Sequence, residues 1–129
     1  MNKIKMMANN PELDMYDSWF LKVGDVPIEA HNMADLSFTL QQIAELLKDR
    51  TTAISQGFIN GTQNYNIFYY DTWDNNRRIV TGRSHDFSVG LCLVEDPSLN
   101  SIFLGLFAYP ILVSEATRQA LLILDLCAS

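Results

Sequence analysis

The sequence is poor in the residues and motifs that would place it in a specialised class of protein. It holds two cysteines, six glycines and four prolines, too few for a disulfide framework or a collagen-like chain. No internal repeat is visible, which argues against a solenoid. No phosphate-binding glycine-rich loop, Cys-x-x-Cys pair or Gly-x-Ser-x-Gly elbow occurs. We therefore expect no bound cofactor and no metal site.

Long hydrophobic segments are also missing. The first residues include two lysines but no apolar stretch behind them, so we expect no signal peptide. The longest apolar run, 102–113, is shorter than the roughly 20 residues that a membrane-spanning helix needs. The sequence therefore predicts a cytoplasmic protein without membrane association, in which both cysteines stay reduced.

Basic residues are scarce as well. Nine Lys and Arg stand against fifteen Asp and Glu, for a net charge of −6. Nucleic-acid-binding domains of this size usually present a basic surface, so this composition disfavours a DNA or RNA partner. The chain has 129 residues, 48% of them hydrophobic, which suits one globular domain with one core. We expect a single domain over 1–129, with 1–12 loosely ordered.

Hydrophobic periodicity predicts a mixed fold. Two segments, 35–49 and 114–127, repeat apolar residues every three or four positions and are expected to be helices, capped by Asp35 and Ser114. The remaining β-prone segments are expected to be strands: 18–23, 26–29, 52–59, 64–73, 77–81, 87–94 and 101–109. Asn60 and Gly61 form a pair typical of a hairpin turn. The predicted class is α+β, an antiparallel sheet of four to six strands with two helices on one face.

Candidates for catalysis are few. Cys92 lies between leucines in a predicted strand and is interpreted as a buried structural thiol, because a reactive cysteine needs an electropositive, partly exposed setting. The polar loop with Arg83, His85 and Asp86 could hold an anion or move a proton. A simpler interpretation is a surface connection in which the arginine pairs with the aspartate. We expect no enzyme activity.

Acidic residues are concentrated in the first third of the chain. Residues 11–36 contain six acidic side chains and one basic one. A second acidic point surrounds an aromatic residue at a predicted strand end, and such aromatic residues often anchor protein interfaces. Concentrated charge steers an oppositely charged partner. The predicted partner-binding residues are Glu12, Asp14, Asp17, Asp25, Glu29, Asp71, Trp73 and Asp74.

In size and charge, with Glu12 through Asp35 and Asp71 through Asp74 carrying the likeness, the chain resembles the immunity proteins that bacteria make against their own toxins. These include the immunity proteins of contact-dependent inhibition. The resemblance implies that a basic protein partner, a cognate nuclease-like toxin domain, is bound and inhibited. Two alternatives remain open: a secretion chaperone for an effector protein, and a small enzyme or ligand-binding domain with a site around Arg83, His85 and Asp86.

Overall fold

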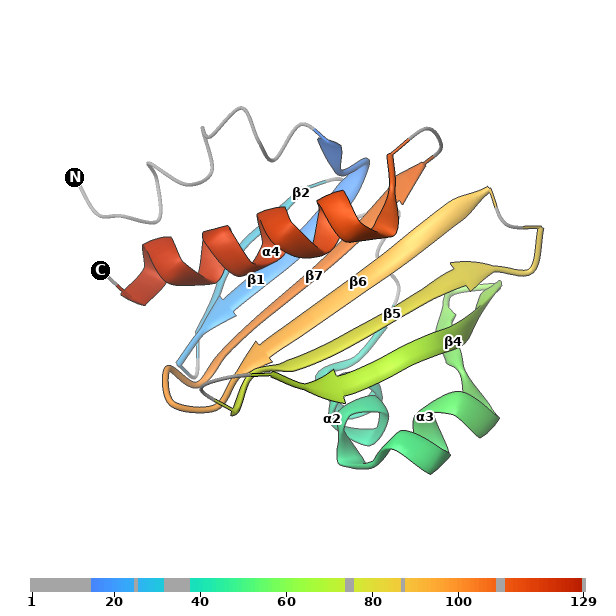
Figure 1. Ribbon diagram of the computed structural model, residues 1–129, viewed down its shortest axis with the longest axis horizontal. Coiled ribbons are helices and arrows are strands. Elements are labelled where there is room, and N and C mark those ends of the chain that lie inside the picture. The colour runs from blue at the N-terminus through green and yellow to red at the C-terminus, as the bar shows by residue number, and fades with distance from the viewer. Residues whose placement is uncertain are drawn as a thin grey trace.

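The protein is built around one antiparallel sheet of seven strands, seen in a computed structural model (Figure 1). The structure describes residues 15–24, 26–31, 38–73, 76–86, 88–108 and 111–128. The strands are β1 (Ser18–Val23), β2 (Val26–His31), β3 (Phe58–Asn60), β4 (Gln63–Thr72), β5 (Arg78–Ser84), β6 (Val89–Asp96) and β7 (Ser101–Ala108). The helices are α2 (Leu40–Lys48), α3 (Arg50–Gln56) and α4 (Val113–Ala128).

The strands follow the order β2-β1-β7-β6-β5-β4-β3, and every neighbouring pair is antiparallel. Strands β3 to β7 form a meander, in which each strand pairs with the next one along the chain. The first two strands join the far side of this meander, where β1 pairs with β7. The first and the last of the seven strands in the sequence therefore pair with each other in the middle of the sheet.

Both faces of the central strands β5, β6 and β7 are buried. Along β6, Leu91 and Leu93 pack on the side of α2, whereas Cys92 and Val94 pack on the side of α4. A strand that is buried on both faces has a continuous run of apolar residues in its sequence. This explains the unbroken apolar stretches of β6 and β7. Figure 1 shows α4 over one face and α2 with α3 against the other.

The predicted α+β class with an antiparallel sheet is confirmed. Two details of that prediction differ from the structure. The sheet has seven strands instead of four to six, and the helices cover both faces instead of one. The reason is that the central strands have no polar face, so each of their two faces needs its own helical cover.

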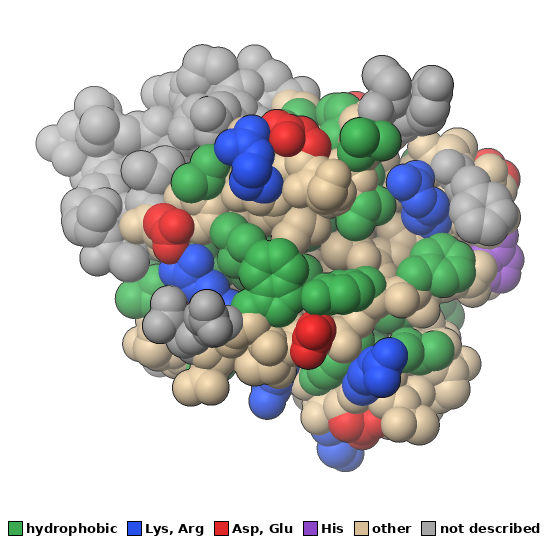
Figure 2. All heavy atoms as spheres, in the orientation of Figure 1, with side chains coloured by type: hydrophobic (Ala, Val, Ile, Leu, Met, Phe, Trp, Pro, Cys, Tyr) green, Lys and Arg blue, Asp and Glu red, His purple; other side chains and the backbone are tan. Residues whose placement is uncertain are grey.

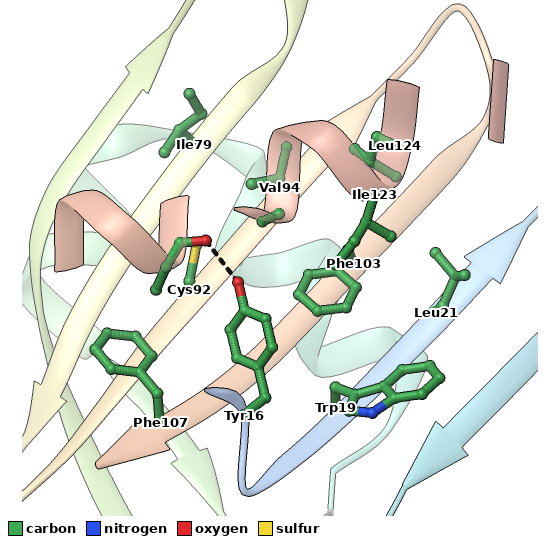
Figure 3. Close-up of a cluster of buried hydrophobic side chains, with 12 residues drawn as sticks. Tyr16, Trp19, Leu21, Ile79, Cys92, Val94, Phe103, Phe107, Ile123 and Leu124 are labelled. Carbon is green, nitrogen blue, oxygen red and sulfur yellow. Dashed lines mark hydrogen bonds between the residues drawn. The ribbon is translucent and has the colours of Figure 1, made fainter. Parts of the chain in front are cut away.

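The core on the α4 side is tied together by Tyr16, which precedes β1. Its ring packs edge-on against Phe103 and Phe107 of β7, with centroids 5.1 and 6.5 Å away. Its hydroxyl donates a hydrogen bond to the carbonyl oxygen of Ala116 in α4 at 2.5 Å (Figure 3). Burial raises the pKa of this phenol well above its usual range. One side chain thus links the start of the described chain to the last helix.

The helical region on the other face departs from the sequence expectation. Helix α2 begins after Thr39, which forms a capping box with Gln42, and the predicted cap Asp35 lies outside the described residues. The segment 52–59 was expected to be a strand, but its first part belongs to α3. Asp49 caps α3 by accepting a hydrogen bond from the Thr52 backbone at 2.7 Å. The prediction of a strand there is wrong because this cap outweighs the β preference of the segment.

The other predicted elements are found close to their expected positions. The hairpin is confirmed, with Gly61 at a φ of 63° and Asn60 paired with Gln63. Its strand β3 is only three residues long. Cys92 is fully buried as a free thiol, as predicted. No helix in the described part of the chain is long and apolar enough to cross a membrane.

Candidate functional site

A groove of about 600 Å³ opens between α4 and the strands β4 and β5. Figure 2 shows this face of the molecule, where hydrophobic side chains gather near the centre and charged ones lie around them. The groove is lined by residues of the sheet and of the first three turns of the helix: Tyr69, Trp73, Ile79, Thr81, Val113, Ser114, Thr117, Arg118 and Leu121. Its walls are mostly apolar, as expected of a binding site.

An irregularity in β4 directs aromatic side chains into this groove. The register between β4 and β5 shifts between Ile67 and Tyr69, as a β-bulge does. Ile67 packs on the α2 side, whereas Tyr69 lines the groove on the α4 side. Gly82 lies opposite the bulge, and a Cβ there would lie 2.3 Å from the carbonyl oxygen of Asn66. The glycine therefore permits the close approach of the two backbones that shapes the groove wall.

Tyr69 and Trp73 form a hydrogen-bonded aromatic pair on the sheet side. The Trp73 indole Nε1 donates to the Tyr69 hydroxyl at 2.7 Å, and that hydroxyl donates to Asp71 Oδ2 at 3.4 Å. Trp73 is 44% exposed and Tyr69 is 38% exposed. The backbone of Trp73 is held by a 2.7 Å hydrogen bond from its N–H to the Arg77 carbonyl. The pair is thus fixed in position while much of its surface remains open to solvent.

The helical wall of the groove consists of Val113, Thr117 and Leu121, spaced four residues apart on α4. Residues with this spacing lie on one face of a helix. Arg118 stands on the rim and pairs with Glu115, with 2.7 Å between Nη2 and Oε1. Its hydrogen bonds keep the pKa of the Glu115 carboxyl below its usual range. The rim therefore offers one charge of each sign beside an apolar interior.

Three interactions support the groove from beneath and from its end. The thiol of Cys92 lies 3.7 Å from the Thr117 hydroxyl, and burial raises the pKa of that thiol to about 12. At the end of the groove, Arg77 pairs with Asp96 at 2.8 Å and with Asp125 of α4 at 2.7 Å. These contacts hold the helix and the sheet at a constant separation.

The polar loop around His85 has a structural role in the described chain. Asp86 Oδ1 accepts hydrogen bonds from the Ser84 and Ser88 hydroxyls, both at 2.7 Å, and from the Ser88 backbone. These bonds lower the pKa of Asp86 to about 2. Asp86 therefore closes the turn between β5 and β6 by accepting these hydrogen bonds as a carboxylate. The described residues contain no cluster of three or more His, Cys, Asp or Glu that could hold a metal ion.

The structure brings together only part of the predicted partner-binding set. Asp71 and Trp73 lie at the groove, where Asp71 accepts the Tyr69 hydrogen bond. Asp17 is exposed just before β1, and β7, β6 and β5 separate that strand from β4. Glu12, Asp14, Asp25 and Asp74 lie outside the described residues, as does the side chain of Glu29.

Residues of α4 were missing from the predicted site. Val113 was predicted to lie in the buried stripe of this helix. No function was predicted for Thr117, Arg118 or Leu121. The sequence held one indication that α4 contributes to the site, because Leu121 is a large apolar residue outside that stripe. It lies half-buried in the groove wall.

Comparison with known proteins identifies the fold. No family model and no curated protein sequence matches the chain. Among solved structures, profilin II of Acanthamoeba castellanii is similar over 87% of this chain and 84% of its own, with 18% identity and a TM-score of 0.65. Schizosaccharomyces pombe profilin matches over 89% and 87%, with 17% identity and a TM-score of 0.66. Human profilin II matches over 97% and 96%, with 11% identity and a TM-score of 0.67. The chain has the profilin fold.

This finding corrects the functional prediction. The predicted activity, inhibition of a bacterial toxin by an immunity protein, is wrong, because the structures that share the fold at high coverage are profilins. The predicted basic toxin partner is wrong for the same reason. Acidity and small size are shared by many unrelated protein families, so the resemblance in charge did not identify the fold.

Proposed function

We propose that this protein is a non-enzymatic binding protein that holds a protein partner against the α4 groove. The observation that supports the proposal is the Tyr69–Trp73 pair, hydrogen-bonded and yet partly exposed beside an apolar groove. A tryptophan at such a place would lose its remaining contact with water when a partner covers it, which is how interface anchors act. Exposed apolar surface of this kind is typical of an interaction site.

The fold suggests which partner to test first. Profilins are actin-binding proteins, so monomeric actin is the first candidate. The rim charges of Arg118 and Glu115 would then contribute orientation, whereas the aromatic pair and Leu121 would contribute most of the affinity.

Isothermal titration calorimetry with monomeric actin tests this proposal. We expect the wild type to bind, and Trp73→Ala to weaken binding by about thirtyfold, equivalent to roughly 2 kcal/mol for an anchor residue. Phe68→Ala is the matched control, because Phe68 is an aromatic residue of β4, the strand that precedes Trp73, is 59% exposed and does not line the groove. We expect it to change affinity less than threefold. Thermal melts establish that both variants fold.

Two results would contradict the proposal. Absence of binding by the wild type would exclude actin as the partner. Equal loss of affinity in Trp73→Ala and Phe68→Ala, with both variants folded, would place the interface elsewhere on this face.

A further inference from the structure

A second depression lies on the opposite face of the sheet, beside α2. It has a volume of about 350 Å³. One side is formed by the ends of four strands and the other by the exposed side of the helix. Its lining residues are Lys22, Arg78, Glu95 and Ile102 from the sheet and Leu40, Ala44, Leu47 and Lys48 from α2.

The strand residues of this depression form one row across the sheet. Lys22 of β1 pairs with Ile102 of β7, Ile102 pairs with Glu95 of β6, and Glu95 pairs with Arg78 of β5. Because neighbouring strands lie about 4.8 Å apart, the Cα atoms of the two cationic residues are separated by about 14 Å. Ile102 provides an apolar floor between them, and Leu40, 47% exposed, stands on the helical wall.

The depression is positive, although the protein as a whole is acidic. Among the described residues, three cations and a single carboxylate line it. Glu95 is already paired with Arg78, with 3.2 Å between Oε1 and Nη1, and Arg78 also donates to the carbonyl of Leu47 at the end of α2. Within the described residues, neither Lys22 nor Lys48 is paired with a carboxylate. The Lys22 ammonium donates to the carbonyl oxygen of Gly24, a neutral group that leaves its positive charge at this flank of the depression.

We propose that this depression binds an extended acidic segment of a partner protein, with two carboxylates that flank one apolar side chain. In an extended chain, every second side chain points to the same side and each residue advances about 3.4 Å. Carboxylates at positions i and i+4 are then about 14 Å apart, which matches the separation of about 14 Å between the Cα atoms of Lys22 and Arg78. The side chain at i+2 would lie over Ile102 and Leu40. This site does not depend on the α4 groove.

Fluorescence anisotropy with labelled peptides tests this site. The probe contains Glu-Ser-Leu-Ser-Glu, and the control peptides replace both Glu by Lys or place the two Glu side by side. We expect only the spaced acidic peptide to bind, and its binding to weaken as salt is raised, because the contacts are ionic and exposed. The double variant Lys22→Gln/Lys48→Gln should weaken binding about tenfold and reduce the salt dependence.

Two further variants serve as controls. Arg50→Gln neutralises a neighbouring exposed cation outside the depression and should leave peptide binding unchanged. Trp73→Ala should also leave it unchanged, which separates this site from the α4 groove. The proposal is overturned if the spaced peptide does not bind, if the folded double lysine variant binds it as tightly as the wild type, or if inorganic phosphate displaces it at equal concentration. The last result would assign the site to a compact anion.

Discussion

The buried thiol of Cys92 predicts how stability should change in alkaline solution. Its side chain is fully buried beneath the groove, and burial raises the pKa of the thiol from 9.0 to about 12. Between pH 9 and 12, the thiol ionises in the unfolded chain but stays protonated in the native protein. The unfolded state then binds fewer protons, so the free energy of unfolding falls as pH rises.

The size of this effect follows from the shift. One pH unit in this window corresponds to roughly 1 kcal/mol for one group, so between pH 9 and 11 Cys92 should remove about 2 kcal/mol of stability. Cys92→Ala has no thiol to titrate. The variant is expected to be less stable at pH 8, because it leaves a small cavity, but to lose less stability than the wild type as the pH rises.

Urea unfolding at pH 8, 9, 10 and 11 under reducing conditions measures this difference. The buried phenol of Tyr16 also destabilises the native state in alkali, since its pKa is raised too, but it is present in both proteins and cancels in the comparison. Stability curves that stay parallel from pH 9 to 11 would show that the Cys92 thiol ionises as readily in the native protein as in the unfolded chain.

Three substitutions test the local structure by urea unfolding at neutral pH. Gly82→Ala should cost about 3 kcal/mol or more, because the new Cβ would lie 2.3 Å from the carbonyl oxygen of Asn66; unchanged stability would contradict the close approach at the bulge. Thr39→Ala should cost about 1 kcal/mol through loss of the α2 cap, and a neutral result would mean that the cap is dispensable. Tyr16→Phe should also cost about 1 kcal/mol, because it removes the buried hydrogen bond to Ala116; an increase in stability would refute this.

Most elements of the fold could be predicted from the sequence, because their hydrophobic periodicity is local. The clearest failure is α3. Thr52 and Ile54 are β-branched and favour a strand, but Asp49 caps a helix and Gly57 ends it with a φ of 68°. Both signals were present in the sequence, and they outweighed side-chain preference in this short segment.

The candidate site was only half predictable. Trp73 could be recognised as an interface residue from its chemistry and its place at a strand end. Its neighbours on α4 could not, because the contact between β4 and this helix depends on the strand order and on the bulge before Tyr69. No local pattern encodes either feature. The immunity-protein hypothesis failed because net charge describes how a surface attracts partners and does not specify a fold.

The position of β1 beside β7 has a consequence for folding during synthesis. Val23 of β1 pairs with Ser101 of β7, a residue made about 80 positions later, which takes roughly 4 to 16 seconds at 5–20 residues per second. Until then, the hairpin of β1 and β2 lacks its neighbouring strand, whereas β3 to β7 can pair in the order in which they are made. Helix α4 follows β7. The groove therefore forms only after α4 has been made, so a growing chain that has not yet reached α4 cannot hold a partner there.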